Sequence, residues 1–155
     1  MRAVLSIGSN MDDREKLLET VFREFADQTV AASPVYSTPP WGVTDQDEFL
    51  NAVLIVDVEE TPIELLRRGQ KLEQAADRQR IQHWGPRTLD VDIVDIDDYV
   101  SDDPALTVPH PYAHERAFVL VPWLAADPDA RLNGVSVRDL IAKLDPAEVS
   151  KIKER

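Results

Sequence analysis

The residues best suited to chemistry lie between His83 and Ile93, in the run His-Trp-Gly-Pro-Arg-Thr-Leu-Asp-Val-Asp-Ile. Two carboxylates, Asp90 and Asp92, stand two positions apart among apolar neighbours. In a β-strand, residues i and i+2 point to the same face, with Cα atoms roughly 6.5–7 Å apart. Such a pair can bind Mg²⁺, which takes oxygen ligands and shares them with substrate phosphates. The spacing also fits a solvent-facing acidic strand, so other residues must decide between the two.

Basic residues gather just before the two aspartates: Arg67, Arg68, Lys71, Arg78, Arg80 and Arg87. Arginine binds phosphate oxygens in a bidentate way, although cations are also favoured at the end of a helix. For Arg78 and Arg80 both interpretations stay open. Arg87 lies three residues from Asp90 and favours phosphate binding. His83 could donate to a phosphate or be an ordinary loop residue, and the sequence does not decide.

A second group of side chains suits a flat heterocycle. The segment Thr38-Pro39-Pro40-Trp41-Gly42 predicts a stiff wall with an indole ring. Phe49 and Asn51 share a strand face, and an amide can both donate to and accept from the edge of a ring. Trp41, Phe49 and Phe118 could stack against that ring, although each alone could equally belong to the core. An Asn in so apolar a strand needs hydrogen-bond partners, which favours a binding role.

Hydrophobic periodicity and turn residues predict the elements that position these side chains. We expect strands at 2–7, 29–37, 48–58 and 88–96, the first ended by Gly8-Ser9-Asn10 as a structural turn. Helices are expected from residue 12 or 13, and from a capping box at 61–64 to about Asp77. Residues 39–47 and 78–87 are predicted loops.

This order of elements predicts an α+β, ferredoxin-like βαββαβ fold, an antiparallel sheet with two helices on one face. Residues 97–155 are less regular, with an extended stretch at 106–111 and helices at 115–126 and 136–144. We expect them to form a C-terminal extension that leaves the other sheet face open or covers it. The length predicts one domain spanning 1–155.

Composition limits the classes of partner. The formal net charge of −12 excludes general electrostatic binding of DNA or RNA. No run approaches the roughly 20 apolar residues of a membrane span, and the apolar N-terminal run is too short for a signal peptide. The absence of cysteine excludes disulfides and thiolate metal sites. We expect a soluble cytoplasmic protein that binds neither nucleic acid nor membrane, and a monomer, although the sequence does not determine the oligomeric state.

Taken in order, the motifs resemble those of the 6-hydroxymethyl-7,8-dihydropterin pyrophosphokinase family of folate biosynthesis. They are Ile7-Gly8-Ser9-Asn10, Ser37-Thr38-Pro39-Pro40, Phe49-Leu50-Asn51-Ala52, the run from Trp84 to Ile93, Leu106-Thr107-Val108-Pro109-His110, and Arg116-Ala117-Phe118. The resemblance implies a ferredoxin-like fold. It also implies an enzyme that transfers diphosphate from ATP to the hydroxymethyl group of a reduced pterin and releases AMP.

The resemblance further implies roles for individual residues. Asp90 and Asp92 would hold two Mg²⁺, with ATP as co-substrate, and Arg78 and Arg87 would act with them in catalysis. The pterin would be bound by Thr38, Pro39, Trp41, Phe49, Asn51 and Phe118. ATP would be contacted by Gln70, Glu73, Arg80, Trp84, Arg87, Ile93, Thr107, His110 and Arg116. The chain departs from the family pattern at His83, Ala105 and Pro111 and in a basic loop one residue shorter, all on the ATP side.

Two other classes of protein explain fewer of these motifs. A non-catalytic ferredoxin-like module that binds a small ligand would not need paired aspartates beside Trp84 and Arg87. A protein that uses divalent cations or an acidic surface for interaction would not need the Thr-Pro-Pro wall with Phe49 and Asn51.

Overall fold

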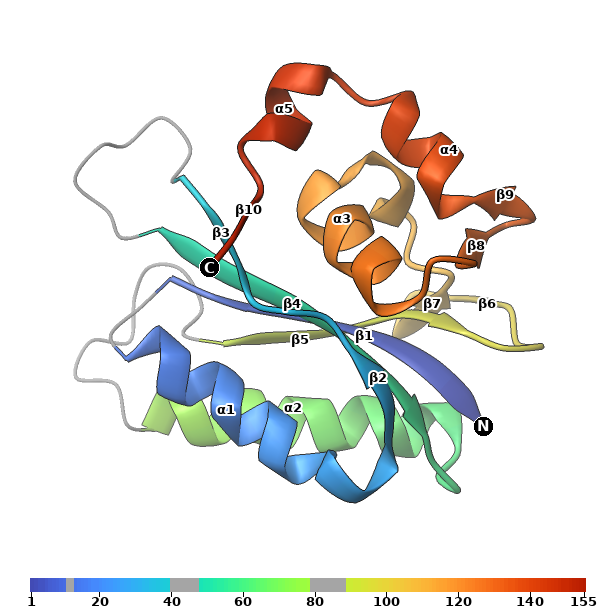
Figure 1. The fold of residues 1–155 in the computed structure, drawn as a ribbon. Helices are drawn as coiled ribbons and strands as arrows, with labels where there is room; N and C mark the ends of the chain where they lie inside the picture. The colour runs from blue at the N-terminus through green and yellow to red at the C-terminus, as the bar shows by residue number, and fades with distance from the viewer. Residues whose placement is uncertain (11–12, 40–47, 79–88) are drawn as a thin grey trace.

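The computed structural model describes residues 1–10, 13–39, 48–78 and 89–155 (Figure 1). Its first half contains β1 (Arg2–Ser9), α1 (Arg14–Glu24), the short helix η1 (Ala26–Gln28), β2 (Thr29–Ala32), β3 (Tyr36–Thr38), β4 (Phe49–Asp57), α2 (Pro62–Arg78) and β5 (Asp90–Ile96). The remainder contains β6 (Ser101–Asp103), β7 (Leu106–Val108), η2 (Ala113–Glu115), α3 (Ala117–Ala126), β8 (Arg131–Leu132), β9 (Val135–Ser136), α4 (Val137–Ala142), α5 (Pro146–Ser150) and β10 (Lys153–Glu154). The predicted loops at 39–47 and 78–87 lie largely outside the described residues.

The main sheet is antiparallel, in the order β10-β3-β4-β1-β5, and β2 also pairs with β4. The prediction of an antiparallel sheet with helices is therefore confirmed. The pairing of β10 with β3 was not predicted, nor was α5. β10 and α5 are short, and hydrophobic periodicity does not reveal elements of two and five residues.

The predicted strand at 29–37 is wrong as a single element, because β2 and β3 are separate strands. Pro34 lies between them and has no N–H to donate to a ladder. The side chain of Ser33 takes the place of a main-chain acceptor in the ladder, because its hydroxyl accepts a hydrogen bond from the N–H of Val53 at 2.9 Å. Its own N–H donates to the carbonyl oxygen of Val53 at 2.8 Å.

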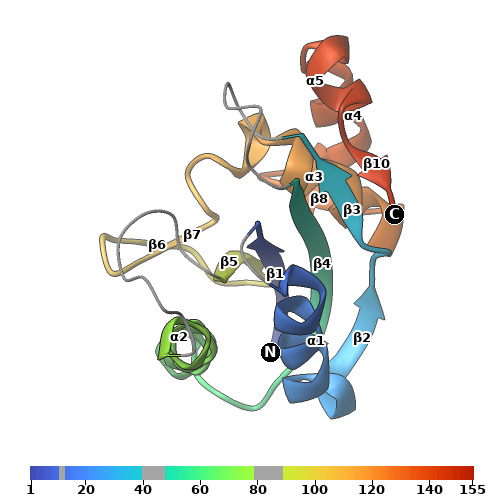
Figure 2. The same cartoon turned by 90° about the vertical axis from the view of Figure 1, so that its left-hand side faces the viewer.

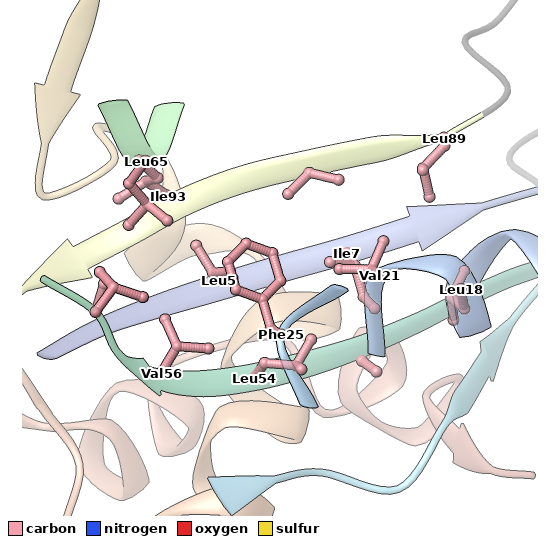
Figure 3. Close-up of a cluster of buried hydrophobic side chains, with 14 of the residues drawn as sticks. Leu5, Ile7, Leu18, Val21, Phe25, Leu54, Val56, Leu65, Leu89 and Ile93 are labelled. Atoms are coloured by element: carbon pink, nitrogen blue, oxygen red, sulfur yellow. The ribbon is translucent and has the colours of Figure 1, made fainter. Parts of the chain in front are cut away.

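α1 and α2 cover one face of the sheet, where the larger core cluster lies (Figures 2 and 3). Side chains from the sheet and from both helices meet there, among them Leu5, Ile7, Leu18, Phe25, Leu54, Leu65 and Ile93. α2 begins at the predicted capping box, in which the N–H of Thr61 donates to the Glu64 carboxylate at 3.0 Å and the N–H of Glu64 donates to the Thr61 hydroxyl at 3.3 Å.

Within the described ranges, α3 and α4 cover one end of the opposite face. Leu120 and Trp123 of α3 pack with Val4, Val53 and Ile55 of the sheet in a second core cluster, to which α4 adds side chains. The other end of this face, towards the start of β4 and of β5, carries polar residues. Among the helices of the described ranges, none combines the length and the apolar character needed to cross a membrane.

Candidate active site

The register of three neighbouring strands brings the two aspartates close to the amide of Asn51. Gly8 of β1 pairs with Asp90 of β5 on one side and with Asn51 of β4 on the other. Two residues earlier in β1, Ser6 pairs with Asp92. Cross-strand partners share a sheet face, so Asp90, Asp92 and Asn51 all lie on the face opposite α1 and α2.

Gly8 is part of the site rather than of a turn. The expectation that β1 ends before Gly8-Ser9-Asn10 is wrong, since β1 continues to Ser9. A Cβ at Gly8 would lie 2.7 Å from Oδ1 of Asn51, a distance too short for a carbon atom. The absence of a side chain at position 8 therefore gives the Asn51 amide its place between the strands.

A cavity of about 230 Å³ opens over this part of the sheet. Its lining is Ser6, Ile7, Gly8, Thr38, Pro39, Phe49, Asn51, Asp90, Asp92, Arg116 and Phe118. Thr38 of β3 pairs with Phe49 of β4, and its hydroxyl accepts a hydrogen bond from Nδ2 of Asn51 at 3.3 Å. One side of the cavity is thus acidic, and the other combines an amide, a hydroxyl and aromatic rings.

Arg116 and Phe118 form the wall of the cavity at the start of α3. The guanidinium carbon of Arg116 lies 5.6 Å from the ring centroids of both Tyr112 and Phe118, which is within the range of a cation–π contact. Phe118 keeps 36% of its surface exposed, so it belongs to the cavity wall and not to the core.

His110 lies beside this wall, close enough for the charges of Arg116 and Asp92 to affect it. Its Nδ1 accepts a hydrogen bond from the N–H of Tyr112 at 3.2 Å, which leaves the proton of the neutral ring on Nε2. Burial lowers the pKa of His110, and the Arg116 cation lowers it further, while Asp92 acts in the opposite direction. The neutral imidazole is therefore a donor through Nε2 near pH 7.

Besides His110, four described residues that were predicted to contact ATP do not line this cavity. Glu73 accepts a hydrogen bond from the N–H of Val91 at 2.9 Å, between the two aspartates. The side chain of Ile93 is buried in the core with α1 and α2 (Figure 3). Gln70 is exposed on α2, and the Thr107 hydroxyl donates to the carbonyl oxygen of Asp103 at 3.1 Å.

The remaining predicted site residues fall in the gaps of the described ranges. They are Trp41, Arg80, Trp84 and Arg87, together with the side chain of Arg78, the last residue of α2. His83, whose role the sequence leaves open, also lies outside the described residues.

Three lining residues, Ser6, Ile7 and Gly8, were not predicted. Ser6 pairs with Asp92, and Gly8 pairs with Asp90 and Asn51, so their place in the site follows from the strand order.

The carboxylates of Asp90 and Asp92 fit a cation that also binds a substrate. Both residues are partly exposed and face the cavity. Within the described ranges, no three His, Cys, Asp or Glu side chains are grouped to hold a metal ion. Two carboxylates leave most coordination positions to water and phosphate oxygens, which is the usual arrangement for Mg²⁺.

Comparison with known proteins identifies the family. The model of the 7,8-dihydro-6-hydroxymethylpterin-pyrophosphokinase (HPPK) family matches residues 4–128, a range that includes every residue of the cavity lining. The chain belongs to the HPPK family. It is therefore a pyrophosphokinase, and the predictions of this family and of an enzyme are confirmed.

Named relatives of the HPPK family agree with the match. The 2-amino-4-hydroxy-6-hydroxymethyldihydropteridine pyrophosphokinase of Mycobacterium tuberculosis is 45% identical over 166 residues, covering 98% of this chain and 88% of the relative. The protein of the same name from Pseudomonas aeruginosa is 36% identical over 146 residues, covering 91% and 90%. The crystal structure of a Plasmodium falciparum HPPK-DHPS triple mutant with pteroate has a TM-score of 0.70 at 16% identity. The match covers 92% of this chain and 43% of that longer one, and it shows a common fold.

Proposed function

We propose that this chain transfers diphosphate from ATP to the hydroxymethyl group of 6-hydroxymethyl-7,8-dihydropterin and releases AMP, a step of folate biosynthesis. One observation carries the proposal: a single cavity joins Asp90 and Asp92 to an amide and two aromatic rings. The carboxylates suit a polyphosphate with its cations, and the rings suit a flat acceptor. Donor and acceptor can therefore meet in one place.

The acceptor lies at the amide side of the cavity. Asn51 uses one Nδ2 hydrogen on the Thr38 hydroxyl and keeps its carbonyl oxygen and other hydrogen for the pterin edge. Phe49 and Phe118 contact the faces of the pterin ring, and Pro39 closes the side. Trp41, which follows Pro39 by two residues, adds a further ring at the entrance.

ATP lies at the acidic side. Asp90 and Asp92 hold two Mg²⁺, which neutralise charge on the phosphates. Arg116 and Nε2 of His110 donate to phosphate oxygens. The guanidinium groups of Arg78 and Arg87 stabilise the charge of the transferring group. The remaining ATP contacts come from Gln70, Glu73, Arg80, Trp84, Ile93 and Thr107. Because the side chain of Ile93 is buried, Ile93 contacts ATP through its main chain.

The reaction needs little covalent chemistry from the protein. The hydroxyl oxygen of the pterin attacks the β-phosphorus of ATP, the bond from that phosphorus to the α-phosphate oxygen breaks, and the hydroxyl proton is lost to solvent. Positioning of the two substrates and cationic stabilisation of the phosphates provide most of the catalysis.

The architecture supports a finer description of the fold. The strand order β3-β4-β1-β5, with α1 and α2 on one face, is that of a ferredoxin-like βαββαβ unit. Residues 97–155 form a C-terminal extension that covers part of the other face. We propose that residues 1–155 act as one domain and as a cytoplasmic monomer. The net charge of −12 supports the absence of nucleic-acid binding.

Product analysis tests the function directly. Purified protein incubated with ATP, Mg²⁺ and the reduced pterin alcohol should form AMP and pterin diphosphate in equal amounts. Chelation of divalent cations should stop the reaction. Release of ADP, or failure to form any product that depends on Mg²⁺, would contradict the proposal. Pterin binding without AMP formation would instead favour the non-catalytic binding module.

A further inference from the structure

β10 pairs along the edge of the sheet next to the acceptor side of the cavity, the side formed by Thr38, Pro39 and Asn51. Lys153 pairs with Ser37 and Glu154 with Tyr36, and the N–H of Arg155 donates to the carbonyl oxygen of Val35 at 2.9 Å. β3 has three residues and pairs with β4 along its other edge. β3 is therefore an interior strand because β10 lies beside it, as Figures 1 and 2 show.

The register of β3 determines the geometry of the acceptor side. β3 ends at Thr38, whose hydroxyl accepts from the Asn51 amide at 3.3 Å. Thr38 and the following Pro39 line the cavity. A strand of three residues forms few ladder bonds to β4, so a second ladder on its other edge limits how far Thr38 can move.

The segment that carries β10 is itself held by contacts on two sides. The guanidinium group of Arg155 pairs with the carboxylate of Glu15 on α1. α5, just before β10, packs against α3, the helix that carries Phe118. Another cavity, of about 460 Å³, is lined by residues of α5 and by Thr38, Phe118 and Ile152.

We propose that β10 is a positioning strap for the acceptor pocket: its pairing with β3 holds Thr38 against Asn51 in the arrangement that binds the pterin. The inference rests on the proposed function, which places the pterin at these residues. Its effect is selective, because Asp90, Asp92 and His110 lie on other elements with no pairing to β10. Loss of the pairing weakens pterin binding and leaves ATP binding nearly unchanged.

Two proline variants separate the ladder from general stability. The N–H of Arg155 faces β3, so in an antiparallel ladder the N–H of Lys153 also faces β3 and that of Glu154 faces away. Lys153→Pro removes a donor to β3, whereas Glu154→Pro is a matched control one residue away. Lys153→Ala controls for the loss of the side-chain charge.

Steady-state kinetics and calorimetry provide the readouts. Lys153→Pro should raise the KM for the pterin roughly 2- to 10-fold, the factor for one ladder hydrogen bond, and should change the KM for ATP by less than about 2-fold. Glu154→Pro and Lys153→Ala should leave both values within about 2-fold. Should Lys153→Pro fail to fold, Arg155→Pro removes the neighbouring ladder donor and should act in the same direction, with Arg155→Ala as its control.

Two results would overturn the proposal. Equal increases in the pterin KM for Lys153→Pro and Glu154→Pro would show that the ladder is irrelevant, and equal increases in the KM values for pterin and ATP would show a general loss of stability. If the unmodified chain forms no AMP, the proposed function fails instead. The strap is then tested by the pterin affinity alone, which calorimetry should find 2- to 10-fold weaker in Lys153→Pro.

Discussion

Asp90 and Asp92 stand on a strand whose apolar side chains are all buried. Val91 and Ile93 between and after them keep only 7% and 6% of their surface exposed. The apolar pair therefore anchors β5 to the core, while the two aspartates lie on the opposite face and line the cavity. Their cost is mutual repulsion, which a bound cation relieves.

Asp92→Asn should abolish turnover without harming the fold. The amide keeps the shape of the carboxylate but loses its charge, so we expect kcat to fall roughly 100-fold or more. The melting temperature should not decrease, because one of two neighbouring like charges is removed. Asp97 is an exposed carboxylate just beyond the end of β5. Asp97→Asn is therefore the control and should keep full activity. An active Asp92→Asn enzyme, or an unfolded one, would refute this role.

Gly8→Ala should damage the acceptor side through crowding. Its Cβ would lie 2.7 Å from Oδ1 of Asn51, so we expect a loss of about 1–3 kcal/mol in the free energy of unfolding and about 10-fold weaker pterin binding. Denaturant unfolding and calorimetry measure the two effects. If crowding is the cause, the stability cost of Gly8→Ala should shrink in an Asn51→Ala background, and additive costs would argue against it.

Asp95 makes the stability of the fold depend on pH. Burial raises the pKa of its carboxyl from 3.8 to about 6. Repulsion from Asp97 also raises this pKa, whereas a hydrogen bond from the Ile96 main chain lowers it. The folded chain therefore binds a proton that the unfolded chain loses, so stability falls as the pH rises from about 4 to about 6, and the loss persists above that range.

Asp95→Asn should remove this loss. We expect the free energy of unfolding to increase by about 1 kcal/mol at neutral pH, less than the full pKa difference implies because the carboxylate keeps some contact with water. At about pH 4 the variant and the unmodified chain should be equally stable in denaturant. Asp97→Asn should give a smaller increase in the same direction. An equal gain at both pH values would show that ionisation is not the cause.

At the level of elements, α2 fixes the strand that carries the aspartates. β5 lies at one end of the main sheet, so the N–H groups on its outer side need partners from elsewhere. Glu73 supplies one by accepting from the N–H of Val91. Gly69 allows the same close approach, because a Cβ there would lie 3.1 Å from Cγ1 of Val91.

Glu73→Ala should therefore lower stability and catalysis together. The lost bond involves a charged acceptor and is worth about 1–3 kcal/mol, and kcat should fall because β5 loses its support between Asp90 and Asp92. Glu73→Gln keeps an acceptor and should restore most of both. Glu64→Ala, which removes a carboxylate from the capping box of α2, should lower the stability slightly and leave kcat unchanged. Equal losses of kcat in the two alanine variants would contradict this account.

At the level of the whole molecule, the two faces of the sheet serve different purposes. One face is fully used for the core with α1 and α2. The other is divided between the packing of α3 and the cavity, so the acceptor pocket is the part of the sheet that α3 leaves uncovered. The tail that follows β5 therefore both completes the core and delimits the site.

The charge of the whole chain should make its stability depend on salt. A net charge of −12 on 155 residues places many like charges within screening distance, and their repulsion is larger in the folded state. Raising sodium chloride from low to near-molar concentration should increase the free energy of unfolding by about 1 kcal/mol. Choline chloride should act equally, since screening does not depend on the cation. No change with either salt would contradict the prediction.

Local patterns in the sequence are sufficient to predict the main elements and the carboxylate pair. The capping box at Thr61 and the alternation of apolar and acidic residues around Asp90 depend on neighbours within about four residues. Both can therefore be predicted without knowing the fold. The break between β2 and β3 is also local in origin, since Pro34 removes a ladder donor. The order of the motifs indicated the family and, through it, the reaction.

Only the tertiary structure decided which distant residues meet. The sequence gives no signal that Gly8 must leave room for Asn51, that Ile93 points into the core while Asp92 faces the cavity beside Ser6, or that β10 pairs with β3. These contacts depend on strand register and on burying both faces of the sheet at once. The physical reason is that a pairing between strands far apart in the chain is selected by the packing of the whole molecule, whereas the sequence around each residue determines only its local conformation.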